Sequence, residues 1–277
     1  RRPPRSTLFP YTTLFRSSDA VTLASNASSR TVVNFAHSSS DLRFAPRITG
    51  DGDVNVFSGI TTLLAQNDYR GDTRLSGGVL RAGADNVFSA GSAYTLTTGG
   101  TLDLNGFSQR TGDIVNGGTL NLAGKTAGAV LTVDGNYTGN GGLINFGTRL
   151  GADGSPTDRM VVTGDTAGDT LLRVSNLGGR GAETLNGITL VEVQGQSGGE
   201  FIQENRIVAG AWDYRLYRDG KDWKITSLDD LETWLPIISE SGEEGSGGEG
   251  GAGGGTPGKG RLTLRPEGAA YAANLAA

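Results

Sequence analysis

The sequence contains no cysteine and only one histidine, His37, among its 277 residues. Disulfide crosslinks and thiol nucleophiles are therefore excluded, and so are the common zinc sites built from cysteine and histidine. No apolar run approaches the roughly 20 residues that a membrane-spanning helix needs. The 24 lysines and arginines are scattered and the net charge is −5, so the chain lacks the basic face that nucleic-acid binding requires. We predict no cofactor, no metal site and no nucleic-acid partner.

Glycine, in contrast, is abundant, with 46 residues. Glycine pairs begin at positions 77, 99, 117 and 141, and alternating apolar and polar residues follow each pair, as in GGTLDLNG at 99–106 and GGTLNLAG at 117–124. Repeats of about 20 residues are typical of stacked architectures. We therefore predict an all-β parallel β-helix in which Leu102 and Leu104 lie over Leu120 and Leu122. Antiparallel hairpins with Asn-Gly turns are the alternative.

The alternation predicts short strands bounded by turn residues. In the first part of the chain they fall at 31–35, 54–57, 94–97 and 131–134, and longer, more apolar strands follow at 160–163, 171–174 and 188–193. We assign residues 18–150 to a β-helix stalk and residues 151–228 to a β cap that covers the end of the stalk. The Gly/Glu-rich residues 229–262 are predicted to be a flexible linker, and residues 263–277 the start of a helix.

Residues 1–17, RRPPRSTLFPYTTLFRS, differ from all that follows. They resemble the in-frame translation of a sequencing adapter, and we expect them to be an artefact rather than part of the natural protein. A signal peptide is the alternative, but Pro10, Thr12 and Thr13 interrupt the apolar core that such a peptide needs.

Several phrases together resemble one family. The phrase at 99–106 resembles the autotransporter-associated β-strand repeat, and LTVDGNYTG at 131–139 with GSPTDRMVVTG at 154–164 resembles the beginning of an autochaperone region. AGAWDYRLY at 209–217 with Trp223 resembles its closing strands. The chain thus resembles the C-terminal passenger region of a pertactin-like type V autotransporter, with the best agreement over roughly residues 70–230.

The resemblance implies a right-handed parallel β-helix with an autochaperone at its end. It also implies a Gram-negative source, and a location at the outer membrane, at the cell surface or outside the cell. Arg265–Glu267 and Tyr271 correspond to the segment that leads to the outer-membrane β-barrel translocator, which we expect to be the main partner and which this sequence lacks. A host-cell surface or the extracellular matrix is the second partner considered.

Candidate site residues each have a structural alternative. Arg70-Gly71-Asp72 is an integrin-type recognition tripeptide, but glycine and aspartate are also expected in a turn between strands. The carboxylate pairs Asp51/Asp53 and Asp153/Asp158 could serve acid–base chemistry or hydrogen-bond to local backbone amides.

His37 lacks a cluster of further ligand side chains around it, which favours a turn residue over a metal ligand. Trp212, Tyr214, Leu216 and Trp223 are predicted to form the core of the cap rather than a sugar-stacking platform.

Two classes of function stay open. The preferred one is a non-enzymatic stalk and autochaperone that supports secretion and folding, as part of a surface adhesin. The alternative is the carrier of an upstream enzyme, such as a protease, a lipase or a polysaccharide-degrading enzyme. An upstream catalytic motif would favour the alternative, and further Gly-Gly-Thr-Leu repeats would favour an adhesin.

Overall fold

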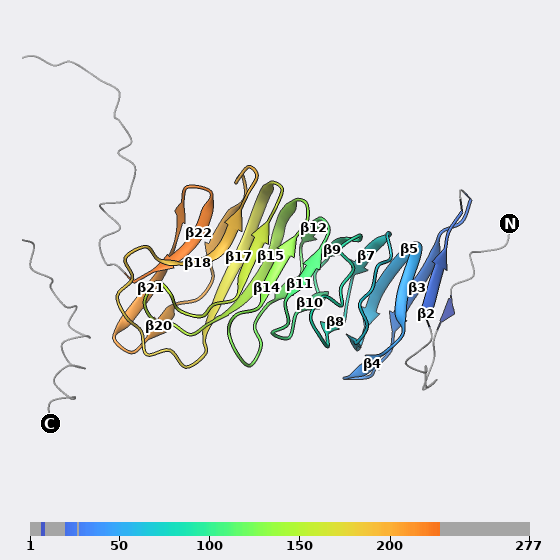
Figure 1. The fold of residues 1–277 in the computed structure, drawn as a ribbon, viewed down its shortest axis with the longest axis horizontal. Coiled ribbons are helices and arrows are strands. Elements are labelled where there is room, and N and C mark those ends of the chain that lie inside the picture. The colour runs from blue at the N-terminus through green and yellow to red at the C-terminus, as the bar shows by residue number, and fades with distance from the viewer. Residues whose placement is uncertain (1–6, 9–19, 27, 228–277) are drawn as a thin grey trace, which may run out of the picture. The chain divides into compact units, whose positions relative to one another are not determined.

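The computed structural model describes residues 7–8, 20–26 and 28–227. The predicted linker, the predicted helix and all of residues 1–17 except Thr7–Leu8 lie outside these ranges. Among the described residues, every regular element is a strand. The strands stack side by side along one axis, and most pair in parallel (Figure 1).

Three rows of parallel strands make up the stack. The first row contains β3 (Thr31–Ala36), β5 (Arg47–Ser58), β7 (Asp72–Leu75), β9 (Ala93–Leu96), β12 (Ile114–Asn116), β15 (Tyr137–Thr148) and β17 (Thr166–Asn176). At its start, β1 (Thr7–Leu8) pairs with β3, and β2 (Ala20–Ala24) pairs with β5.

The second row contains β4 (Leu42–Phe44), β6 (Ile60–Leu63), β8 (Val79–Ala82), β10 (Thr101–Asp103) and β13 (Thr119–Asn121), and it continues through β15 and β17 to β19 (Glu200–Gln203). Strands β15 and β17 are long enough to take part in both rows. The third row contains β11 (Gln109–Thr111), β14 (Val130–Val133), β16 (Arg159–Val162) and β18 (Ile188–Val193).

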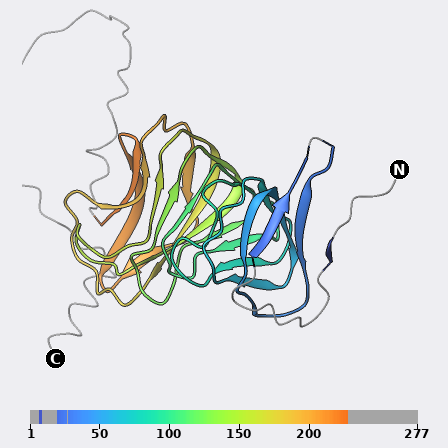
Figure 2. The ribbon, with the colours of Figure 1, turned by 45° about the vertical axis from the view of Figure 1, so that its right-hand side comes forward.

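The register of the second row confirms the predicted parallel β-helix. Leu102 pairs with Leu80 on one side and with Leu120 on the other, and Leu120 pairs with Ile144, always in parallel. These four side chains are fully buried. Each coil therefore covers the apolar face of the coil before it, at the spacing of about 4.8 Å that separates neighbouring strands. The turned view shows the chain winding from one face to the next between strands (Figure 2).

The glycine pairs are needed where the chain turns into the second row. Gly99 has a φ of +94°, a left-handed conformation that favours glycine. A Cβ at Gly100 would lie 2.2 Å from the carbonyl oxygen of Leu75, and one at Gly118 would lie 2.4 Å from that of Gly100. Glycine is thus favoured in this part of the repeat phrase because the backbones of successive coils touch at this corner.

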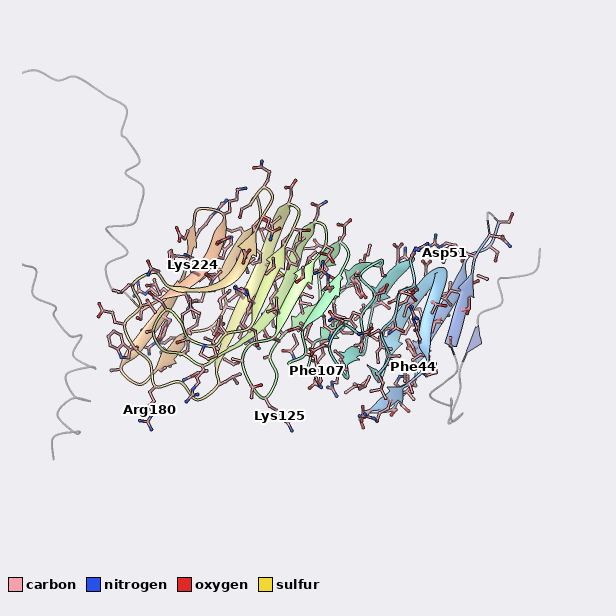
Figure 3. All side chains as sticks on the ribbon, in the orientation of Figure 1. Phe44, Asp51, Phe107, Lys125, Arg180 and Lys224 are labelled. Atoms are coloured by element: carbon pink, nitrogen blue, oxygen red, sulfur yellow. The ribbon has the colours of Figure 1, made fainter. Side chains whose placement is uncertain are left out.

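Polar side chains line the outside of the coils. Lys125 and Arg180 extend outward from turns on one side of the strands (Figure 3). Ion pairs join neighbouring coils, as between Arg81 and Asp103 (2.8 Å) and between Arg110 and Asp134 (2.5 Å). None of the described residues forms a helix long and apolar enough to span a bilayer.

Parallel pairing continues past residue 150, through β16, β17, β18 and β19. Apart from isolated bridges, antiparallel pairing among the described strands begins with β20 (Ile207–Ala209), β21 (Trp212–Asp219) and β22 (Asp222–Thr226). The predicted division between stalk and cap at residue 150 therefore does not coincide with a change in strand pairing, and as a functional boundary it stays a prediction.

Candidate functional site: the closing strands

The stack ends in a change of strand direction. β22 pairs antiparallel with β18, with Ile225 opposite Ile188, and β21 pairs antiparallel with β22 and with β20. We call β20, β21 and β22 the closing strands. An open solenoid end would expose apolar core and free strand edges, and the reversed strands cover the end of the third row.

A line of aromatic rings joins the closing strands to the interior of the coils. Trp223 of β22 meets Phe201 edge-on at 5.4 Å between ring centroids, and Phe201 stacks on Tyr137 at 5.9 Å. All three side chains are buried. Burial raises the pKa of Tyr137 to about 12, although hydrogen bonds with Thr170 and Asn116 act in the opposite direction. Rings packed in these geometries stabilise beyond their buried area.

The hydroxyl of Tyr214 connects β21 to two distant loops. Its oxygen lies 2.9 Å from the carbonyl oxygen of Gly151 and 3.0 Å from that of Ala182, and it accepts a hydrogen bond from the Ala182 amide at 3.0 Å. Burial raises the pKa of Tyr214, so the hydroxyl stays protonated as a donor. One side chain thus fixes segments that are 63 and 32 residues away in the sequence.

Polar side chains bind the last turns to the coil beneath them. The side-chain amide of Asn205 accepts a hydrogen bond from the backbone nitrogen of Val174 and donates one to the carbonyl oxygen of Val174, both at 3.0 Å. Arg173 and Glu204 form a two-bond ion pair at 2.6 and 2.7 Å. Gln203 Oε1 accepts from the backbone amide of Leu216 at 2.8 Å, which links β19 to β21.

Asp153 and Asp158 do not act as a pair. Asp153 accepts four hydrogen bonds from residues 185–187, and although burial raises its pKa, these bonds prevail and lower it. Asp158 is completely buried and accepts from the amides of Gly128, Ala129 and Gly147 at 2.7–2.9 Å. Burial raises its pKa more than these bonds lower it. Each carboxylate is thus engaged by backbone amides of a different segment.

Asp51 and Asp53 also do not act as a pair of carboxylates. Asp51 is exposed, whereas the carboxylate of Asp53 is largely buried and bonds to Arg30 at 2.6 and 3.1 Å. Asp53 Oδ1 further accepts from the backbone amide of Asp72 at 2.9 Å. Burial raises the pKa of Asp53, but the bonds with Arg30 and Asp72 prevail and hold it below its ordinary value.

The tripeptide Arg70-Gly71-Asp72 lies where the chain enters β7. The Arg70 amide donates to Gly50 O at 2.9 Å, and a Cβ at Gly71 would lie 1.9 Å from Gly52 O. The Arg70 side chain is exposed, but the carboxylate of Asp72 is ion-paired with Arg74. The tripeptide is thus a turn stacked on the preceding coil, and receptor binding by it stays a prediction.

His37 also has local partners. Its Nδ1 accepts from the Ser39 amide at 3.2 Å and its Nε2 lies 2.9 Å from the Thr61 hydroxyl, so the neutral ring carries its proton on Nε2. Burial lowers the pKa of His37, which favours this neutral form. Within the described residues, no group of three or more histidine, cysteine or acidic side chains could hold a metal ion.

The four aromatic and apolar residues predicted for the cap core differ in depth. Tyr214 and Trp223 belong to the buried core, whereas Trp212 and Leu216 are half-buried and pack against it. Sequence reasoning missed Asn205, Gln203 and the cluster of Thr184, Thr226 and Ser227 hydroxyls. These are single polar residues without periodicity, and nothing in the sequence marks the backbone groups that they bind.

One family model overlaps this region, and several known proteins resemble parts of the chain. The family model of the Autochaperone Domain Type 1 matches residues 109–216, from β11 into β21. The chain is 37% identical over 246 residues to the uncharacterized protein YuaQ of Escherichia coli K12, covering 87% of this chain and 17% of that protein. It is 38% identical over 180 residues to the adhesin BmaC autotransporter of Brucella suis, covering 62% and 4%.

A third relative is the autotransporter adhesin AIDA-I of Escherichia coli, which is 44% identical over 110 residues, or 37% of this chain and 8% of that protein. The chain thus spans about a sixth or less of the length of each of these three relatives. The residues that the family model matches include the last coils, β20 and the first part of β21, and they end before β22. The chain is a passenger region of a type V autotransporter, carries an autochaperone domain and is displayed at the surface of a Gram-negative cell.

Proposed function

We propose that the closing strands and the coils beneath them form the part of the passenger that folds first outside the cell and holds the exported chain there. The observation that carries this proposal is the set of contacts that gather distant segments at one end. Tyr214 joins residues 151 and 182, and Trp223 continues the aromatic line into the coils. No nucleotide is hydrolysed at the outer membrane, so export needs another source of free energy. A domain that folds outside the cell, with a typical folding free energy of about 5–15 kcal/mol, opposes movement of the exported chain back through the membrane.

The test is the replacement Tyr214→Phe in the passenger together with its own outer-membrane translocator domain, which we propose as the cognate partner. The change removes one hydroxyl, whose single proton faces the carbonyl oxygens of Gly151 and Ala182 and whose oxygen accepts from the Ala182 amide, but it keeps the ring. We expect less surface-displayed passenger and faster cleavage by external protease. The matched control is Tyr217→Phe, which removes one bond to Asn186 O from a partly exposed ring.

Unchanged display in Tyr214→Phe, combined with a lowered melting temperature of the purified chain, would reject the export role. Deletion of residues 151–228 is the stronger version of the test. Normal surface display after that deletion would also reject the proposal.

We further propose that the chain itself has no enzymatic activity and belongs to an adhesin. Two relatives bear adhesin in their names. The candidate carboxylates Asp53, Asp153 and Asp158 are each held by structural partners, which leaves them unsuited to acid–base chemistry. Binding of bacteria that display the passenger to host cells or extracellular matrix, compared with bacteria that lack it, tests the adhesive role. The sequence upstream of this region decides between an adhesin and an enzyme carrier.

A further inference from the structure

The sequence contains four Asn-Gly steps, at Asn105, Asn116, Asn140 and Asn186. Asparagine followed by glycine is prone to deamidation, because glycine has no side chain to hinder attack of its backbone nitrogen on the asparagine Cγ. The attack requires a mobile side chain and a glycine that can rotate. The four steps differ in both respects.

Two of the steps are restrained by hydrogen bonds. Asn116 is fully buried and donates to the Tyr137 hydroxyl at 3.2 Å, and the nitrogen of Gly117 donates to Leu96 O at 2.7 Å. The nitrogen of Gly187 donates to Asp153 at 3.0 Å, and the side chain of Asn186 donates to the same carboxylate at 3.0 Å. In both cases the glycine backbone nitrogen that would attack and the asparagine side-chain amide that it would attack are each held by a hydrogen bond.

The third step is restrained by packing. Asn105 lies in a left-handed turn with a φ of +51°, and its side chain donates to Ala82 O at 3.3 Å. A Cβ at Gly106 would lie 3.1 Å from the Cα of Gly124 in the next coil. Rotation about this turn is therefore limited by the neighbouring backbone.

The fourth step, Asn140-Gly141, lies at a bulge in β15. Both residues are exposed. Pairing with β17 passes from Asn140 opposite Asp169 directly to Gly142 opposite Thr170, so Gly141 faces no partner residue. Gly141 has a φ of +71°, and no atom lies within 4 Å of the position that a Cβ would take. A bulged residue is left out of the ladder, which leaves this glycine the freest of the four.

We propose that Asn140 is a site of spontaneous deamidation in the displayed protein. The nitrogen of Gly141 forms a bond to Cγ of Asn140, and the side-chain nitrogen leaves as ammonia together with the proton of the Gly141 amide. Water then opens the resulting succinimide ring, which yields aspartate or isoaspartate at position 140. The reaction needs no oxidant and no reactant other than water.

The product changes the charge along the outside of three strands. Asn140 lies opposite Asp169 of β17, and Asp169 lies opposite Glu200 of β19. A carboxylate at position 140 completes a row of three acidic residues on adjacent strands, about 4.8 Å apart. Like charges directly opposite one another destabilise a sheet, and here they would weaken the coils that underlie the closing strands.

Incubation of the purified chain at mildly alkaline pH, followed by peptide mapping with mass spectrometry, tests the proposal. We expect Asn140 to gain one mass unit several-fold faster than Asn105, Asn116 or Asn186, and we expect an isoaspartate fraction among the products. Conversion at Asn105 or Asn186 as fast as at Asn140, or no conversion at Asn140, would overturn it.

Two variants measure the consequence. Asn140→Asp carries the product charge, and Asn140→Gln keeps the amide but reacts slowly. We expect Asn140→Asp to have a lower melting temperature than Asn140→Gln at low salt, with a gap that narrows as salt screens the acidic row. Equal melting temperatures at low salt would overturn the proposed loss of stability.

Discussion

The repeated coils and the closing strands bury comparable side chains by different means. In the coils, Leu80, Leu102 and Leu120 occupy equivalent positions on successive strands, and each has a similar residue above and below it. In the closing strands, Tyr214 and Trp223 have no equivalents, and each contacts segments that are distant in the sequence. Repetition spreads stability over many similar interfaces, whereas unique contacts concentrate it at one end.

The largest expected effect is that of Trp223→Ala. The indole is 5% exposed, meets Phe201 at 5.4 Å, and lies 5.9 Å beneath the guanidinium of Arg218. Truncation of a buried aromatic residue costs about 3–5 kcal/mol. Urea unfolding should show this loss, and hydrogen exchange should show that protection falls throughout β18, β21 and β22. The half-buried Trp212→Ala is the control, and an equal loss there would contradict a special role for Trp223.

The matching change in the coils is Leu120→Ala. Leu120 is fully buried between Leu102 and Ile144, and its truncation costs about 2–5 kcal/mol. Because each coil contacts mainly its neighbours, we expect the loss of hydrogen-exchange protection to stay within β10, β13 and β15. Loss of protection that extends to the closing strands would remove the distinction between the two regions.

The pH dependence of stability should differ in sign between two buried carboxylates. Burial raises the pKa of Asp158 above its ordinary value of 3.8, so its contribution to stability is greatest below that value and is lost as pH rises through the folded-state pKa. The pKa of Asp53 is lowered by Arg30 and the Asp72 amide despite burial. Its contribution is present above 3.8 and is lost as pH falls through the folded-state pKa.

Replacing each carboxylate by an amide, which does not titrate, separates the contributions of Asp158 and Asp53 to stability. The free energy of unfolding of the wild type minus that of Asp158→Asn should decrease as pH rises from the acid range. The same difference for Asp53→Asn should increase. Urea unfolding over a pH series measures both slopes. Slopes of the same sign would show that the surroundings of the two carboxylates do not act as described.

The sequence predicted the repeated part of the fold better than the unique part. Strand Ile188–Val193 matches its prediction, and the pairing of Leu102 with Leu120 is confirmed, because both depend on periodic apolar residues. The bonds of Asn205 to Val174 and of Asp158 to three backbone amides carry no such signal. Their partners are backbone groups 11 to 31 residues away, and only the folded chain brings them together.

The smallest expected effect concerns the ion pair between Arg173 and Glu204. Both side chains are partly exposed, at 44% and 30%, and solvent screens such a pair, so that it contributes little to stability. We expect Arg173→Gln to lower the free energy of unfolding only slightly, and the effect should weaken with added salt. In the coils, Arg110→Gln breaks the similar pair with Asp134 and serves as the comparison. A clearly larger loss for Arg173→Gln would show that surface contacts, as well as the aromatic core, fasten the closing strands to the last coil. Equal small losses would instead assign that attachment to Trp223, Tyr214 and the side-chain bonds of Asn205 to the backbone.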